Sequence, residues 1–444
     1  MSNNNTNFKV YAFDRLPIVE IVNDIILDSI KQGASDIHFD PTDGPTKVRI
    51  SLDGDLVDYS EVPKDYTRNL ITSIKIFSKM NITETRKPQD GPIKAVIKDT
   101  NVDLRVSVLP TNRGEKIVIR ILDYSMSMQG LESLGFSESN YEKMVSMISN
   151  PHGIILVTGA TGSGKSTTVY SVLQRLNREE VNIITVEDPV EMDIDGINQV
   201  QTNSDIGLNF GTVLRSVLRQ DPNIIMIGEI RDTETAKIAV RASITGHLVL
   251  STLHTNDALS TIERLLDMDV ERYLLASSLT GVVAQNLARR LCNHCKMIKV
   301  PNEYEKELFR EVMKVNVNQL YTAGAGCQYC LRGYQGRIAI HEVLVISQEI
   351  RDAISNRVKK EKFRELVYSG DTTTMLQDGL SKVLKGITSV EEVLKLIELD
   401  DDSEAGRLQS KLQKAIYESM VSNQDVNIAA PILEESIVKE VIDV

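Results

Sequence analysis

The sequence predicts an α/β fold built on a mostly parallel sheet and preceded by a smaller α+β domain. Between residues 153 and 251, short apolar segments alternate with helix-compatible segments, which is the pattern of parallel α/β sheets. Between residues 47 and 122, short runs of alternating apolar and polar residues are typical of antiparallel strands. We expect the parallel strands at residues 153–157, 183–186, 224–227 and 248–251.

Periodicity and composition divide the chain further. Apolar residues recur at helical spacing from Leu16 to Lys31, which predicts an amphipathic helix at the start of the first domain. The periodicity breaks again after residue 123, as expected of an interdomain linker. The predicted parts are a disordered leader (1–15), an α+β domain (16–123), a linker (124–137), an α/β core (138–290), a cysteine module (291–335), a helical region (336–398) and an acidic, partly disordered tail (399–444).

The composition argues against several classes of protein. A net charge of -12 disfavours a nucleic-acid partner, and the absence of Trp disfavours base stacking. The polar N-terminus predicts no secretory signal, and no apolar run approaches the length of a transmembrane helix. We therefore expect a cytoplasmic protein without a transmembrane segment that could dock on a membrane partner.

The strongest motif in the sequence is a phosphate-binding loop with the pattern G-x-x-x-x-G-K-[ST]. It follows the apolar strand GIILVT and precedes a helix-compatible run, which a chance Gly-rich turn would not be expected to do. Its backbone N–H groups would contact phosphates, Lys165 would add a charge, and Ser166 would bind Mg²⁺. The predicted ATP-binding residues are Gly159, Ala160, Thr161, Gly162, Ser163, Gly164, Lys165, Ser166 and Thr167.

Carboxylates follow two further predicted strands. Glu229 ends the segment NIIMIGE, and Glu187 and Asp188 end ITVED. Acids at strand ends near a phosphate site suit a metal ion or an attacking water. The alternatives are an acid that opens the next helix and a turn rich in Asp and Pro. His247 and His254 flank another strand, and structural and catalytic roles both remain open for them.

Two CxxC pairs, Cys292/Cys295 and Cys327/Cys330, predict a tetrahedral Zn²⁺ site. The loop between the pairs is longer than in common zinc modules, but each pair still supplies two thiolates on one side of a tight knuckle. A reducing compartment disfavours disulfides. The alternatives are buried free thiols or a redox pair.

Taken together, these segments resemble the type II secretion and type IV pilus assembly ATPases, the GspE/PilB group. The resemblance covers about residues 15–398. The matching segments are ASDIHFDP (34–41), LRVSVLPTNRGEKIVIRIL (104–122), GATGSGKST (159–167), ITVEDPVE (184–191), LRSVLRQDPNIIMIGEIRD (214–232), TGHLVLSTLHTND (245–257), both CxxC pairs, GRIAIHEVL (336–344) and DGLSKVLKGITSVEEVL (378–394).

The resemblance implies a RecA-like ATPase core after a PAS-like domain, and it implies roles for individual residues. Glu229 corresponds to the Walker B acid, Glu187 and Asp188 to the acidic box, and His247 and His254 to the histidine box. Two arginine pairs also match positions that the family uses. Arg105 and Arg120 match arginines that the N-terminal domain places against the nucleotide, and Arg215 and Arg219 match a pair near subunit contacts.

The resemblance further implies a homohexamer that docks on an inner-membrane platform protein and drives assembly of a fibre of pilin-like subunits. Retraction motors of the same superfamily typically lack the two CxxC pairs, so the cysteines favour assembly. A motor for a DNA-uptake pseudopilus remains an alternative. A nucleic-acid translocase and a scaffold that binds ATP without hydrolysis are rivals of other classes. The short segment before Ala34 predicts no counterpart of the extra N-terminal domain that many relatives carry.

Overall fold

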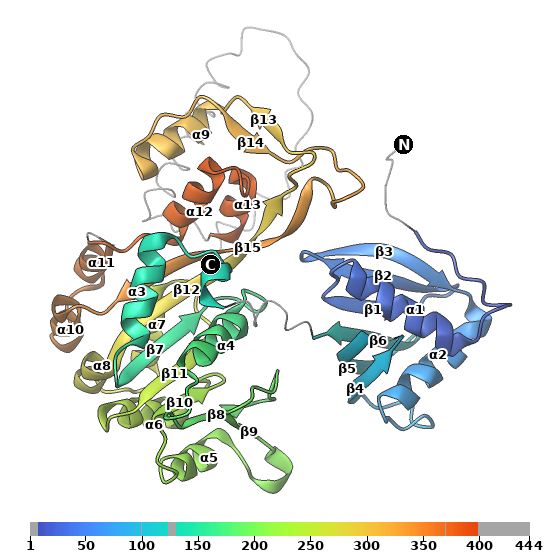
Figure 1. The fold of residues 1–444 in the computed structure, drawn as a ribbon, viewed down its shortest axis with the longest axis horizontal. Coiled ribbons are helices and arrows are strands. Elements are labelled where there is room, and N and C mark those ends of the chain that lie inside the picture. The colour runs from blue at the N-terminus through green and yellow to red at the C-terminus, as the bar shows by residue number, and fades with distance from the viewer. Residues whose placement is uncertain (1–7, 99, 123–129, 369, 398–444) are drawn as a thin grey trace, which may run out of the picture.

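The computed structural model describes residues 8–98, 100–122, 130–368 and 370–397. Two units lie side by side (Figure 1), an N-terminal domain with its own sheet and a larger unit built on a second sheet. Residues 1–7 of the predicted leader, residues 124–129 of the predicted linker and the whole predicted tail (399–444) lie outside the described residues. The predicted fold class is confirmed, while the predicted domain boundaries stay predictions.

The N-terminal domain is a six-stranded antiparallel sheet with the order β3-β2-β1-β6-β5-β4. Helices α1 and α2 cover it, and the apolar face of α1 is buried because Ile21, Val22, Ile25 and Ile26 recur at helical spacing. The elements are α1 (Ile18–Lys31), β1 (Asp36–Asp40), β2 (Thr46–Leu52), β3 (Asp55–Val62), α2 (Lys64–Phe77), β4 (Gln89–Ile97), β5 (Thr100–Thr111) and β6 (Gly114–Ile121).

Residues 8–15 differ from the predicted disordered leader. Tyr11 and Phe13 are buried in the core of the N-terminal domain, and the Lys9 N–H donates to the Tyr59 carbonyl at 2.8 Å. The buried rings of Tyr11 and Phe13 hold this segment on the domain, because each ring buries a large apolar surface.

The larger unit contains a seven-stranded sheet with the order β15-β12-β7-β11-β10-β8-β9, parallel except between β12 and β15. Its strands are β7 (Gly153–Thr158), β8 (Ile183–Glu187), β9 (Asn198–Gln201), β10 (Ile224–Ile227), β11 (Leu248–Leu253), β12 (Leu279–Leu291) and β15 (Tyr334–Val345). β15 occupies the start of the region predicted as helical, because its antiparallel pairing with β12 joins segments far apart in sequence.

Helices cover both faces of this sheet, because alternate strand residues point to opposite faces. Ile155 and Val157 face α3 (Glu138–Ile148) and α4 (Lys165–Leu176), whereas Ile154 and Leu156 face the helices of the other layer. That layer contains α5 (Phe210–Val217), α6 (Thr233–Ile244), α7 (Ala258–Asp267), α8 (Arg272–Ser278), α10 (Gln348–Ser355) and α11 (Lys360–Tyr368). Short turns of 3₁₀ helix lie at Leu131–Leu134 and Ser204–Ile206.

The cysteine module and the last helices share one core. Leu308 and Phe309 of the module pack against Leu380, Val383 and Val393. The elements are β13 (Met297–Lys299), α9 (Glu303–Leu308), a π-helical turn (Phe309–Met313), β14 (Leu320–Thr322), α12 (Met375–Leu384) and α13 (Val390–Leu396).

Polar contacts join the two units. Asp55 pairs with Arg289 at 2.6 Å, and Asp53 accepts a hydrogen bond from the Gly336 N–H at 2.8 Å. Arg105 donates to the Val190 carbonyl at 3.0 Å.

Among the described residues, no helix is both long and apolar enough to cross a bilayer.

Candidate functional site

The predicted phosphate-binding loop connects β7 to α4 at the carboxyl edge of the sheet. Gly159, Gly162 and Gly164 have φ angles of 147°, 80° and 89°, a region that favours glycine. A Cβ on Gly159 would lie 2.2 Å from the carbonyl oxygen of Gln285. The loop therefore needs glycine for its backbone conformation and for its close approach to β12.

The polar groups of the loop converge at the N-terminus of α4. The Lys165 ammonium is buried and donates to the Gly159 and Ala160 carbonyls at 2.8 and 2.9 Å. Burial lowers the pKa of Lys165. The Ser163 hydroxyl is buried without a hydrogen-bond partner in the part of the chain described, and Ser166 is exposed. An unpaired hydroxyl beside a helix N-terminus is what an anionic ligand would satisfy.

Glu229 lies at the same edge of the sheet, just after β10. It forms ion pairs with Arg231 and, at 3.3 Å, with His254, which follows the adjacent strand β11. Burial raises the pKa of Glu229, but Arg231 and His254 outweigh it and hold that pKa below its usual value. The negative charge of Glu229 acts on Lys165 as well and opposes the lowering of its pKa by burial. The structure thus brings together Lys165, Glu229 and His254.

Arg231 is a site residue that sequence reasoning missed. Its guanidinium contacts the carboxylate of Glu229 and faces the charge of Asp188. The available signal was its position in the segment GEIRD, two residues after Glu229. Because the cationic Arg231 contacts the predicted catalytic acid Glu229, it belongs among the residues of the site.

Glu187 sits in a different environment at the end of β8. Its carboxylate is buried and accepts hydrogen bonds from the hydroxyls of Tyr170 and Thr185 and, at 3.1 Å, from the Gln199 amide. Burial and the neighbouring carboxylate raise the pKa of Tyr170. Since Tyr170 belongs to α4, Glu187 ties the helix that follows the loop to the sheet. Asp188, the next residue, is exposed.

His247 does not join this group. It precedes β11 and its Nδ1 lies 2.8 Å from the Ala242 carbonyl, whereas His254 follows the same strand. A strand of six residues spans about 20 Å, so the two histidines lie at opposite edges of the sheet. Arg215 pairs with Glu234, and Arg219 donates to the Arg215 carbonyl at 2.6 Å. Arg215 lies on α5, Arg219 follows its C-terminal end, and both side chains are exposed.

The two arginines of the N-terminal domain have different partners. Arg105 reaches the loop after Asp188, where it also pairs with Glu191 at 3.1 Å. Arg120 pairs with Asp36 of its own domain at 2.9 Å, and 63% of its side chain is exposed. Arg105 is thus next to the acidic box, while Arg120 is held within its own sheet.

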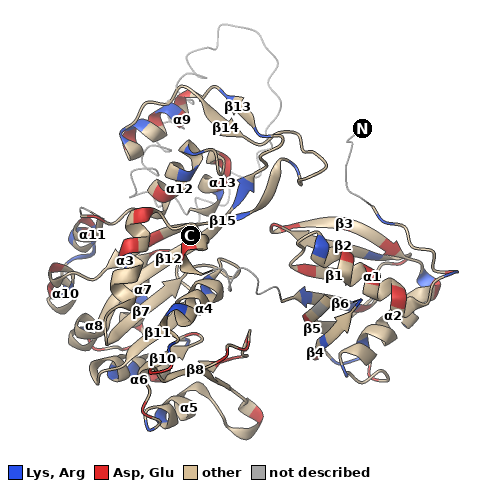
Figure 2. Ribbon diagram, in the orientation of Figure 1, with Lys and Arg blue, Asp and Glu red and all other residues tan. Residues whose placement is uncertain are grey.

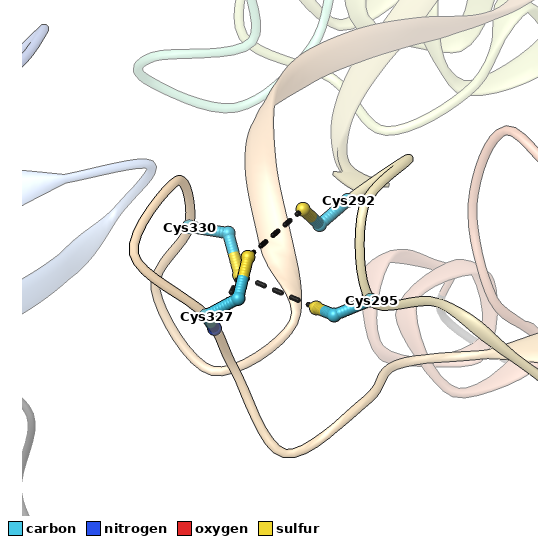
Figure 3. Close-up of side chains that lie close together, drawn as sticks. All are labelled: Cys292, Cys295, Cys327 and Cys330. Atoms are coloured by element: carbon cyan, nitrogen blue, oxygen red, sulfur yellow. Dashed lines mark hydrogen bonds between the residues drawn. The ribbon is translucent and has the colours of Figure 1, made fainter.

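The four cysteines form one cluster (Figure 3). Their sulfur atoms all lie within 4.8 Å of one another, with separations of 3.8 Å for Cys292–Cys327, 3.5 Å for Cys295–Cys330 and 3.6 Å for Cys327–Cys330. Four thiolates around a tetrahedral Zn²⁺ with Zn–S bonds near 2.3 Å would lie about 3.8 Å apart. The donor set and spacing therefore fit zinc.

The match to known proteins extends over most of the chain. The family model described as "Type II/IV secretion system protein" matches residues 12–395. The chain belongs to this family of secretion and pilus ATPases. This confirms the resemblance and the type of motor predicted from the sequence.

Relatives from both branches of the family are similar to this chain. The type II secretion system protein E of Pectobacterium carotovorum is 45% identical over 386 residues, which is 87% of this chain and 76% of the relative. The type IV pilus assembly ATPase PilB of Thermus thermophilus is 46% identical over 377 residues, which is 84% of this chain and 42% of the relative.

Solved structures share the fold. The pilus retraction motor PilT with bound ADP aligns with a TM-score of 0.61 and 26% identity, over 85% of this chain and 96% of that one. The ATPase DotB of Legionella pneumophila aligns with a TM-score of 0.64 at 21% identity, over 88% of this chain and 99% of that one, which is a likeness of fold alone.

Proposed function

We propose that this chain is a motor that hydrolyses Mg²⁺–ATP to drive assembly of a type IV pilus or a type II secretion pseudopilus. The observation that carries the proposal is the convergence of a glycine-requiring loop, the buried Lys165 and the ionised Glu229 at one edge of a parallel sheet. A cation facing the phosphates and an acid facing the water are the two charges that phosphoryl transfer to water requires.

Lys165 and the N–H groups of residues 159–167 hold the β- and γ-phosphates in this mechanism. Lys165 releases the carbonyls of Gly159 and Ala160 to do so, and its buried position strengthens the contact with an anion. Ser166, exposed at the start of α4, and the exposed Asp188 would hold Mg²⁺, which would neutralise phosphate charge when bound.

Glu229 orients and polarises the attacking water. Its lowered pKa keeps it ionised at neutral pH, and His254 contacts one of its two carboxylate oxygens. Glu187 positions α4 from within its hydrogen-bonded pocket and thereby assists Glu229. The catalytic role of His247 keeps only the support of the family resemblance, because the sheet separates it from Glu229.

Arg105 and Arg120 of the N-terminal domain stabilise charge on the γ-phosphate when that domain closes on the loop. Arg105 already contacts the segment after Asp188, so a small movement suffices for it. Arg120 must first leave Asp36, a half-exposed pairing that is weak in water. Arg215 on α5 and Arg219 just after it have exposed side chains and suit a contact with a neighbouring subunit.

The cysteine cluster holds one structural Zn²⁺ per chain and takes no part in chemistry. Four thiolates fill a tetrahedral shell and leave no position for water.

The chain works as a homohexamer at the cytoplasmic face of the cell membrane, where it docks on a platform protein and moves pilin-like subunits indirectly. Figure 2 shows acidic and basic residues interspersed over the described elements, which suits protein partners better than nucleic acid.

Two substitutions test the proposal. Lys165→Ala removes a phosphate contact, so both ATP affinity and turnover should collapse. Glu229→Gln preserves shape and removes the charge, so ATP should bind while turnover falls by about 10²-fold or more. Equilibrium binding of a fluorescent ATP analogue and phosphate release, measured on the full chain, separate the two effects. Hydrolysis by Glu229→Gln at the wild-type rate would remove Glu229 from the mechanism.

A further inference from the structure

Gln285 of β12 contacts the phosphate-binding loop and the helix α4 that follows it. Its Nε2 donates to the Ser163 carbonyl at 2.8 Å, and its Oε1 accepts from the Thr168 hydroxyl of α4 at 2.8 Å. Its own carbonyl oxygen lies where a Cβ of Gly159 would be. The residue is 1% exposed, and the nitrogen and the oxygen of its amide each have a partner within the protein.

The position of Gln285 follows from the strand register. β12 runs parallel to β7, with Ala284 opposite Thr158, so Gln285 comes level with the first residue of the loop. Its side chain then crosses under Gly164, where an added Cβ would lie 3.1 Å from its Nε2. One residue therefore contacts the start, the end and the following helix of the loop.

We propose that Gln285 is a positioning residue for the ATP site and that its amide presets the phosphate-binding loop for nucleotide. The inference rests on the proposed function. A loop held in its binding conformation before nucleotide arrives spares ATP the entropy of ordering it. Lys165 and Ser166 directly follow the tethered segment, so their positions depend on it. The two side-chain hydrogen bonds of Gln285 both go to the protein, so we assign it a positioning role and no direct contact with the nucleotide.

Gln285→Leu tests this directly, since it keeps the volume and removes both hydrogen bonds. Without these bonds the loop would populate its binding conformation less, so we expect the KM for ATP and the Kd for ADP to rise about tenfold. The loss concerns ground state and transition state equally, so kcat should change less than about threefold. An unchanged KM in a folded Gln285→Leu protein that hydrolyses ATP would overturn the proposal.

A double substitution separates positioning from simple stability. Gln285→Leu alone leaves the Thr168 hydroxyl buried and unpaired, which destabilises the fold. Adding Thr168→Val replaces both partners with apolar groups and should restore the unfolding midpoint. The Ser163 carbonyl still lacks its donor, so the KM should stay high. A KM that recovers together with stability would show a structural role only and would contradict the proposal.

Asn286→Leu is the matched control. Asn286 is the next residue of β12 and its amide also donates to a backbone carbonyl, that of Leu396 at 3.1 Å, away from the loop. We expect this variant to lose stability while its KM stays at the wild-type value; a raised KM here would show that the effect is not specific to the loop. If the wild-type chain neither binds nor hydrolyses ATP, the proposed function fails, whereas a failure confined to Gln285→Leu removes only this inference.

Discussion

Glu229 and Glu187 lie at the ends of neighbouring strands, but their surroundings give them different chemical roles. Glu229 is 17% exposed and faces the cationic Arg231 and the ring of His254, so its carboxylate is charged and accessible to water. Glu187 is 3% exposed and surrounded by hydroxyl and amide donors. The sequence pattern is the same for both, a strand ending in an acid, and only the neighbours decide which acid can meet a water molecule.

His341 of β15 is buried without a hydrogen bond to either ring nitrogen among the described residues, and it stacks on Phe136 at 3.7 Å. Burial, assisted by the nearby charge of Lys382, lowers its pKa well below 6.5. As the pH falls through about 6.5, His341 therefore takes up a proton in the unfolded chain but stays neutral in the folded chain. Stability should be complete above this pH and fall below it, by about 1.4 kcal/mol per pH unit.

Urea unfolding of the wild type and of His341→Leu at pH 7.5 and pH 5.5 measures this effect. The variant should lose less stability than the wild type between the two pH values. Glu342 lies beside His341 and titrates in both proteins, so its contribution cancels in the difference. Equal losses for both proteins would contradict the assignment of a neutral buried histidine.

Strand β12 links three features that are separate in the sequence motifs. Gln285 contacts the phosphate-binding loop, Arg289 joins the N-terminal domain to α13, and Cys292 begins the cysteine cluster directly after the strand. Side chains four residues apart on a strand lie on the same face of the sheet. Gln285 and Arg289 therefore place the loop contact and the interdomain contact along one rigid strand.

Arg289 offers an element-scale prediction because its two partners differ in burial. Glu392 is 7% exposed and binds the guanidinium through both oxygens, whereas Asp55 is 40% exposed. Glu392→Gln leaves a buried cation poorly paired and should cost about 3 kcal/mol or more of unfolding free energy. Asp55→Asn should cost less than about 1 kcal/mol. Guanidinium unfolding of both variants checks this, and equal losses would contradict the account.

The sequence could predict the loop between β7 and α4, since its glycines, its lysine and its flanking periodicity are all local signals. It could not predict the pairing of β15 with β12 or the position of Gln285, because strand register arises from contacts across the chain. It also could not separate His247 from His254, which look equivalent until the direction of β11 is known. Local chemistry is readable from sequence, whereas the partners across a sheet are not.

On the scale of the whole molecule, the nucleotide loop and the cysteine cluster belong to one unit but to different cores. The phosphate-binding loop rests on the main sheet, whereas the module packs on α12 and α13. Loss of metal should therefore loosen the module and leave the loop folded. The N-terminal domain contacts the larger unit through a few polar contacts and through Leu331, which packs against its core; a domain that moves requires such a limited interface.

Removal of one thiolate tests this separation. Cys327→Ser should reduce bound zinc from one to near zero per chain and lower the unfolding midpoint, because metal binding contributes folding energy on the order of 10 kcal/mol in comparable sites. The Kd for ADP should change less than about threefold. Metal analysis by mass spectrometry and nucleotide titration provide the readouts. A wild-type protein without zinc and with four freely titratable thiols would leave the free-thiol interpretation.

The central claim is that the chain hydrolyses ATP as an assembled motor, with residues such as Arg105 placed by a defined arrangement of subunits. The most direct measurement is specific ATPase activity across a dilution series, with the mass of the particle determined at each concentration. We expect little turnover by the monomer and a rise that follows the hexamer fraction. Constant specific activity from monomer to hexamer, or no turnover at any concentration, would contradict the account.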